Sequence, residues 1–284
     1  MFRKVSLFEK IFYHLLLIAV AAIMLLPIVY VITGSFKSNS EIFIEPAKLL
    51  PDKVVLDNYK QLIANADFNV GRLLFNTVIY TAWCIFVNVL ICPTGAYVFA
   101  RGNFPGKKLI FTLFTSLMFI GPGAITIYCQ FDIVRAVGLP ISLYTNMFLA
   151  LFGIPITNYY IIKGYIDSVP KDLDESAKID GCSFIGIYFR IIFHMITPVL
   201  ATQVIFAFQG AWNNYIGVLL WTSSRPWEWT LTVGIMMMRN SGDAAIGIGF
   251  TMAAAVISMI PVIIVFCIFN KYIVDGISAG AVKA

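Results

Sequence analysis

Six long stretches without Asp, Glu, Lys or Arg constrain this chain more than any other feature of its sequence. They cover residues 11–36, 73–100, 109–131, 136–162, 191–224 and 244–270. Each is long enough to cross the roughly 30 Å hydrocarbon core of a bilayer as a helix. A helix also satisfies its own backbone hydrogen bonds where no water is available. We therefore predict an all-α integral membrane protein with six transmembrane helices.

The composition excludes an ordinary water-soluble domain. Hydrophobic residues make up 60% of the chain and charged residues only 12%, whereas a soluble domain carries about 25% charged residues. A transmembrane barrel is also excluded, because its strands would alternate apolar and polar residues over about ten positions, and none of the six stretches alternates.

The basic residues predict the orientation of the chain. The first stretch is too long for a signal peptide and no small-residue cleavage site follows it, so we interpret it as a retained span. With the N-terminus inside, twelve of the 20 Lys and Arg residues lie on the cytoplasmic side, as the positive-inside rule expects. The predicted organisation is a cytoplasmic N-terminus (1–10), a six-helix transmembrane domain (11–270) and a cytoplasmic tail (271–284).

Several other classes of site are not indicated. The net charge of +5 fits basic residues that flank membrane spans, so no nucleic-acid partner is expected. The five cysteines have no Cys-x-x-Cys spacing and the two histidines lie far apart, which suggests neither a metal site nor a disulfide framework. No clustered residues resemble a hydrolytic site, which weakens the alternative of an integral membrane enzyme.

Uncharged amides recur within the apolar stretches, and we expect them to face other helices or a watery cavity rather than lipid. Amides beside aromatic residues suit a neutral, hydroxyl-rich ligand. The candidate pathway residues are Gln209, Trp212, Asn213 and Tyr215, with helix packing as the alternative role for each. The absence of charges deep in these stretches argues against an ion-coupled secondary transporter. Internal breakers, at Pro93, 121–123, Pro155 and Pro261, indicate either a pathway lining or ordinary kinks.

The segment between the fourth and fifth stretches predicts a short helix, a sharp turn and a second helix on the cytoplasmic face. Pro170 suits a first helical turn, and Asp172, Asp174 and Glu175 complement the helix dipole there. The Asp180-Gly181 pair then predicts a helix stop, since glycine readily adopts the left-handed conformation. An amphipathic interfacial loop is the alternative interpretation.

The same segment carries a family resemblance. Residues 175–181, Glu-Ser-Ala-Lys-Ile-Asp-Gly, resemble the Glu-Ala-Ala, three residues, Gly loop of permeases of binding-protein-dependent ABC importers. Residues 101–108, 168–171, 210–213 and 276–284 resemble the maltose-transporter (carbohydrate uptake) branch, so the resemblance covers essentially the whole chain. The resemblance implies that Glu175, Ser176, Ala177, Asp180 and Gly181 form a coupling region (about 167–195) that docks on an ATPase.

The resemblance also implies the partners and the location. They are a second homologous permease, two ATPase subunits that bind ATP and Mg, and an extracytoplasmic solute-binding protein, in a bacterial cytoplasmic membrane. No cofactor is expected in this chain, which would not be an enzyme. The expected cargo is a sugar or oligosaccharide, with a charged saccharide or a glycerol phosphodiester as the alternative.

Three departures from the family pattern bear on these expectations. Phe193-His194 replaces a usual Leu-Pro and is expected to straighten the helix that enters the fifth span. Asn214 stands where the family often has a carboxylate, so a role that needs a carboxylate is not expected there. Ser176 stands for a common Ala, which should leave docking intact.

One outside segment, residues 221–243, combines aromatic and basic residues of the kind enriched at interfaces. We expect Arg225, Trp227, Trp229 and Arg239 to contact the binding protein. An aromatic belt at the membrane surface is the alternative.

Overall fold

The computed structural model describes residues 6–65, 68–120, 124–153, 155–240 and 247–281, and within them it contains helices and no strand. The chain divides into two compact units. Unit 1 comprises residues up to 70 together with 235–261, and unit 2 comprises 71–234 together with the residues from 262 on. The helical composition confirms the predicted all-α class.

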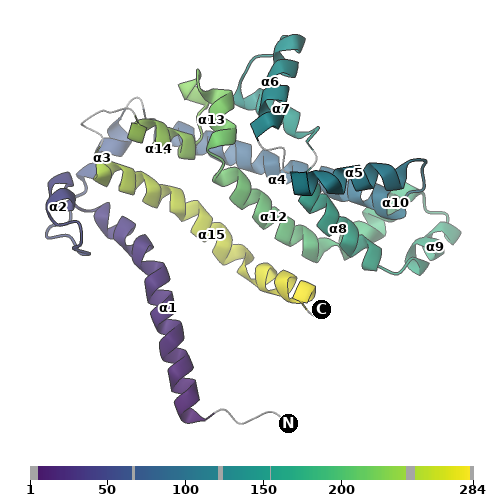
Figure 1. Cartoon of the computed structure of the whole chain (residues 1–284), viewed down its shortest axis with the longest axis horizontal. Helices are drawn as coiled ribbons and strands as arrows, with labels where there is room; N and C mark the ends of the chain where they lie inside the picture. Colours follow the sequence, from purple (N-terminus) through teal and green to yellow (C-terminus); the bar gives the residue numbers. More distant parts are fainter. Residues whose placement is uncertain (1–5, 66–67, 121–123, 154, 241–246, 282–284) are drawn as a thin grey trace. The chain divides into compact units, whose positions relative to one another are not determined.

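Unit 1 contains the N-terminal helices and parts of two later ones (Figure 1). Its complete helices are α1 (Leu7–Gly34), α2 (Asn39–Ile44) and α3 (Asp57–Ala64). Helices α14 (Leu231–Asn240) and α15 (Ile248–Ala281) each begin in one unit and end in the other.

Unit 2 contains the remaining helices of the described chain. They are α4 (Val70–Arg101), α5 (Lys107–Ile120), α6 (Ala124–Val137), α7 (Leu143–Ala150), α8 (Ile156–Ser168), α9 (Asp172–Ile179), α10 (Phe184–Ile187), the π-helix η1 (Tyr188–Ile192), α11 (Phe193–Met195), α12 (Thr197–Trp212), α13 (Ile216–Thr222) and the 3-10 helix η2 (Pro226–Glu228).

Three of the six apolar stretches form single long helices. Helices α1, α4 and α15 are long and apolar enough to cross a membrane, and the bent pair formed by 184–195 and 197–212 makes a fourth span if it is counted as one, within the residues described. Pro27, Pro93 and Pro261 lie inside α1, α4 and α15, so these prolines do not interrupt their helices. Proline is tolerated in membrane helices where neighbouring groups satisfy the freed carbonyl.

The third and fourth stretches form shorter helices. The third is divided into α5 and α6, and the Gly-Pro-Gly breaker between them lies outside the described residues. The fourth is divided into the end of α6, α7 and α8, and Pro155 stands at the N-cap of α8. Proline fits there because its missing N–H would have no partner at a helix start.

The expectation that the helix entering the fifth stretch is straight was wrong. The axes of 184–195 and 197–212 differ by 77°. Pro198 lies in the first turn of α12, where it cannot donate to the carbonyl of His194 and its ring crowds that carbonyl. The hydroxyl of Thr197 donates to the His194 oxygen instead, at 2.8 Å, and the π-helix η1 lies just before the bend.

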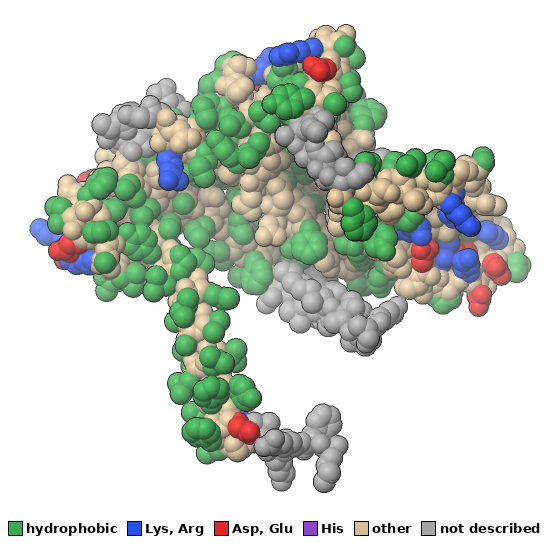
Figure 2. All heavy atoms as spheres, viewed as in Figure 1, with side chains coloured by type: hydrophobic (Ala, Val, Ile, Leu, Met, Phe, Trp, Pro, Cys, Tyr) green, Lys and Arg blue, Asp and Glu red, His purple; other side chains and the backbone are tan. Residues whose placement is uncertain are grey.

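Helix α1 is apolar on all sides and almost wholly uncovered by the rest of unit 1. It starts with a capping box, in which Ser6 and Glu9 exchange hydrogen bonds of 3.2 and 2.8 Å. Gly34 is its one buried residue, and Figure 2 shows hydrophobic side chains along its length. A helix that is hydrophobic all round belongs in an apolar environment, which fits a membrane span.

A buried amide holds unit 1 together after α1. Asn58, at the start of α3, donates from Nδ2 to the carbonyl oxygens of Ser35 and Lys37, at 2.9 and 2.8 Å. Asn58 is 5% exposed, so water could not satisfy these carbonyl groups if its side chain were lost. The short helix α3 is thereby anchored to the end of α1.

This anchor generates a stability prediction. Replacing Asn58 by Ala should leave two carbonyls of a buried site without their donor and destabilise the packing of α3 by about 1–3 kcal/mol. Limited trypsin digestion of the purified protein should then cut faster at Lys60. Asp57→Asn is the control, since Asp57 makes only an exposed ion pair with Lys60 at 3.3 Å, which is worth at most about 1 kcal/mol. Equal digestion of Asn58→Ala and Asp57→Asn would contradict the assignment.

Candidate functional site

The predicted helix-turn-helix between α8 and α10 is present. Helix α9 spans Asp172–Ile179, and Lys171 stands at its N-cap, where its carbonyl oxygen accepts from the N–H groups of Asp174 and Glu175. Pro170 therefore precedes the helix rather than lying in its first turn. Three acidic residues follow in that turn and complement the helix dipole.

Gly181 ends α9 in the left-handed conformation, with a φ of 81°. The N–H of Cys182 donates to the carbonyl of Ala177 at 2.9 Å, and the N–H of Gly181 donates to the carbonyl of Lys178 at 3.0 Å. These two bonds form a Schellman motif. Ser183 then caps α10 by accepting from the N–H of Gly186 at 3.1 Å, so the turn is fixed on both sides.

Helix α9 has an inward and an outward face. Ala177 is 6% exposed and belongs to a core with Ile166 and Ile187, while Asp174, one turn earlier, is also buried. Glu175 and Ser176 are exposed. Their face also carries Ile179, 87% exposed, which the sequence interpretation did not include. Its spacing of four residues from Glu175 was the signal, since such residues share one face of a helix.

The inward face is tied to the end of α4 by an ion pair. Arg101 Nε lies 2.6 Å from Asp174 Oδ2, and the two side chains are 5% and 8% exposed. Arg101 Nη2 also donates to the carbonyl of Val169 at 2.6 Å. A buried pair of this kind contributes little net stability, but loss of one partner leaves an unpaired charge and is strongly destabilising. The pair therefore fixes where α9 lies relative to α4.

A polar cavity of about 240 Å³ lies beside this pair. Arg101, Lys107, Lys171 and Lys178 line it together with Asp174 and Glu175, among others. Figure 2 shows the Lys, Arg, Asp and Glu side chains gathered around α9. The surface here is charged and lies next to helices that are otherwise apolar, which is the pattern of a membrane–water boundary.

At its other end α4 holds the segment after α13. Asn76 Nδ2 donates to the carbonyl oxygens of Trp227 and Trp229, both at 2.9 Å. Thr77 Oγ1 accepts from the N–H of Leu231 at 2.7 Å. These contacts join residues more than 150 positions apart, and no pattern in the sequence indicated them.

The four expected binding-protein contacts have different environments. Trp227 is 54% exposed, whereas Trp229 is partly buried and donates from its indole to the Thr222 carbonyl at 3.0 Å. Arg225 pairs with Glu228 at 3.0 Å. Arg239 is exposed in the last turn of α14 and belongs to unit 1, while the other three belong to unit 2.

The amides within the spans largely bond to other helices, as expected. Asn158 donates to Asn88 at 2.7 Å, and Asn214 donates to the hydroxyl of Tyr80 at 2.9 Å. Of the candidate pathway residues, Gln209 and Asn213 are exposed and Tyr215 is partly exposed. Trp212 is 3% exposed and stacks on Phe208, so its ring packs within the subunit.

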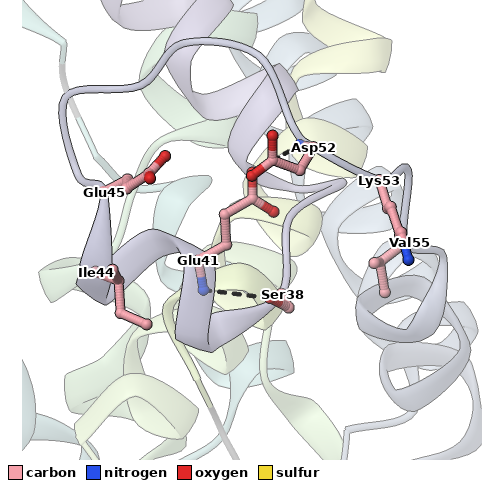
Figure 3. Close-up of a pocket in the computed structure, with 7 residues that line it drawn as sticks. All are labelled: Ser38, Glu41, Ile44, Glu45, Asp52, Lys53 and Val55. Carbon is pink, nitrogen blue, oxygen red and sulfur yellow. Dashed lines mark hydrogen bonds between the residues drawn. The ribbon is translucent and has the colours of Figure 1, made fainter.

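A second hollow, of about 410 Å³, lies in unit 1 and is lined by Ser38, Glu41, Ile44, Glu45, Asp52, Lys53 and Val55 (Figure 3). Glu41 accepts from the N–H of Asp52 at 2.8 Å. Hydrogen bonding to Asp52 and to Glu45 raises the pKa of Lys48 above its usual value. The carboxylates that line this hollow thus already have partners within the protein. Among the described residues, no group of three or more His, Cys, Asp or Glu side chains could hold a metal ion.

Comparison with known proteins gives the family. Residues 62–279 match the family described as binding-protein-dependent transport system inner membrane component. The chain belongs to this family. It is a permease component of an ABC importer and a multi-pass protein of the cytoplasmic membrane.

Relatives match over nearly the whole permease. This chain is 32% identical to the diacetylchitobiose uptake system permease protein of Streptomyces coelicolor, over 95% of this chain and 88% of that protein. It is 31% identical to the galactooligosaccharides transport system permease protein of Bacillus subtilis, over 96% and 95%. A crystal structure of a bacterial ABC transporter involved in the import of the acidic polysaccharide alginate matches with a TM-score of 0.80, at 21% identity, over 96% and 99%.

The outer segment generates a prediction that separates folding from docking. Glu228 is 5% exposed and its Oε2 accepts from the N–H of Leu143, at the start of α7, at 2.7 Å. Glu228→Ala should therefore cost about 1–3 kcal/mol, because a buried donor loses its partner. Arg225→Ala should cost less than Glu228→Ala, because the Arg225 side chain is 34% exposed and Glu228 keeps its hydrogen bond from Leu143.

Thermal unfolding of the purified permease in detergent measures both changes. Glu228→Gln is the matched variant, because its amide oxygen can still accept from Leu143. A melting temperature of Arg225→Ala as low as that of Glu228→Ala would show that Arg225 serves the fold, and it would remove Arg225 from the expected binding-protein contacts.

Proposed function

We propose that this permease translocates a sugar or oligosaccharide delivered by an extracytoplasmic binding protein, and that α9 couples it to an ATPase. The observation that supports coupling most directly is the outward face of α9, held by the Schellman turn at Gly181 and by the Arg101–Asp174 pair. A short helix fixed at both ends presents the same surface whenever the subunit moves, as rigid-body coupling requires.

The proposed topology has six spans with both termini in the cytoplasm. It rests on the six uncharged stretches and on the basic loop 101–108. In this topology α9, between the fourth and fifth spans, lies in the cytoplasm, and the segment around Trp227 lies outside. The 1–10 and 271–284 segments are then cytoplasmic.

The proposed partners follow the family. A second permease of similar fold would complete the pathway, two ATPase subunits would bind ATP and Mg and hydrolyse ATP, and a binding protein would dock outside. A solved complex of the alginate transporter with its oligosaccharide-bound periplasmic protein, similar in fold to this chain, supports the last of these (TM-score 0.65, 14% identity, 93% of each chain).

A neutral saccharide is the proposed cargo because relatives named for diacetylchitobiose and galactooligosaccharides match over the whole length. The exposed amides Gln209 and Asn213 also suit hydroxyl groups, since an amide both donates and accepts hydrogen bonds. A charged saccharide is the second candidate, favoured by a 30% identical relative, the sulfoquinovosyl glycerol transport system permease protein of Agrobacterium fabrum, over 91% of this chain and 89% of that protein.

The coupling proposal predicts a set of docking variants. Ile179→Asp places a charge on the outward face without touching the core, because the native side chain is 87% exposed. It should reduce recovery of the ATPase in detergent pull-downs at least about tenfold, since charge in an apolar contact is costly. Gly181→Val should do the same by straining the positive φ, at a cost of about 1 kcal/mol or more.

Ser176→Ala is the control, because the serine hydroxyl bonds within α9 to the carbonyl of Asp172 at 2.8 Å. It should leave both ATPase recovery and uptake near wild type. Normal recovery of the ATPase with both Ile179→Asp and Gly181→Val would show that α9 is not the coupling element.

The cargo proposal predicts a transport phenotype. Deleting the gene for this chain should abolish uptake of a labelled neutral oligosaccharide, and re-expression should restore it. An amino acid taken up by another system serves as the control. Selective loss of uptake of an anionic saccharide would instead establish the second candidate.

A further inference from the structure

We propose that α4 is a strut that transmits docking of the binding protein outside to α9 inside. The inference rests on the proposed function, because it takes the α9 face and the Trp227 segment as the two docking surfaces. What it adds is a physical connection between them through one continuous helix of unit 2.

The inner end of the strut is the Arg101–Asp174 pair. Arg101 is the last residue of α4, and its guanidinium forms an ion pair with Asp174 and donates from Nη2 to the carbonyl of Val169, just before α9. Two contacts from one planar group fix direction as well as distance. A displacement of the end of α4 therefore moves α9 with it.

The outer end of the strut is formed by Asn76 and Thr77, in the second turn of α4. Asn76 bonds two carbonyls of the Trp227–Trp229 segment, and Thr77 bonds the N–H of Leu231. Both residues are buried, at 6% and 0% exposure, so water does not compete for these bonds. Trp227, half exposed, is thus attached to α4 through its backbone.

Between these ends α4 is continuous, and its inner half packs against α8 in a buried core. From Asn76 to Arg101 the rise of about 1.5 Å per residue gives a length of about 38 Å. At Gly95 the side chain of Tyr159 from α8 occupies the space that a Cβ would take, with its hydroxyl oxygen 1.6 Å from that position, and Asn88 accepts from Asn158 of α8. Because no break separates the two ends of this helix, a displacement of one end is transmitted to the other.

The test measures how strongly the binding protein stimulates ATP hydrolysis by the reconstituted complex. Arg101→Lys keeps the charge but loses the planar two-point contact, and Asn76→Ala removes the donor to both carbonyls. Each should lower the stimulation about fivefold, which corresponds to about 1 kcal/mol, while the amount of ATPase that copurifies stays at the wild-type level.

The double variant decides the proposal. Sites this far apart normally act independently, so two unconnected effects would multiply to about 25-fold. If both act through one strut, Arg101→Lys combined with Asn76→Ala should be no worse than the stronger single variant. If Asn76→Ala does not assemble, Thr77→Val tests the same end with a side chain of the same shape.

Two controls separate the strut from general damage. Asp167→Asn removes an ion pair of 2.5 Å with Lys163 that lies within α8 and joins no two elements, and Ser224→Ala changes an exposed residue of the outer segment. Both should retain full stimulation. Multiplicative loss in the double variant, or unchanged stimulation in the single ones, would overturn the strut. The amount of ATPase that copurifies is measured separately from the stimulation. If the coupling proposal itself is wrong, Ile179→Asp and Gly181→Val will recover the ATPase normally, whatever the strut variants do.

Discussion

The structure depends on the requirement that polar groups among apolar helices find partners within the protein, because lipid offers none. Asn76, Asn88 and Asn214 each form a hydrogen bond with another segment of unit 2. An apolar helix surface is covered equally well by lipid or by another helix, so these hydrogen bonds favour the contact between helices. In unit 1, Asn58 lies outside the predicted spans and links the end of α1 to α3 by the same kind of buried bond. The amide hydrogen bonds therefore specify which helices contact one another, whereas the apolar side chains fill the contacts without specifying them.

The apolar stretches predicted the class of fold and the three long helices, but not where the other stretches are divided. Proline illustrates the limit, since Pro93 and Pro261 lie within continuous helices while Pro155 begins one. Whether a proline interrupts a helix depends on neighbours that satisfy the freed carbonyl, and those are tertiary. The 77° bend before Pro198 was missed for the same reason.

The candidate site was predictable where the signal was local. The stop at Gly181 follows from residues next to it, and the structure shows the positive φ that the sequence indicated. The faces of α9 were not assigned, so Ala177 was grouped with exposed neighbours although it lies in the core, and Ile179 was left out. The Arg101–Asp174 pair joins positions far apart in the chain, and a single sequence gives no measure of such proximity.

Gln209 and Asn213 are exposed at the C-terminal end of α12, and this exposure affects the subunit before it is assembled. Asn213 Nδ2 donates to the carbonyl of Gln209 at 3.0 Å, but those polar groups of the two amides that face acyl chains lack a hydrogen-bond partner, and this lowers the stability of the isolated subunit. A partner that covers the exposed amides would remove this loss of stability. Membrane quality-control proteases act on subunits that stay in the less stable state, so the cellular amount of this permease would follow the supply of whatever covers α12.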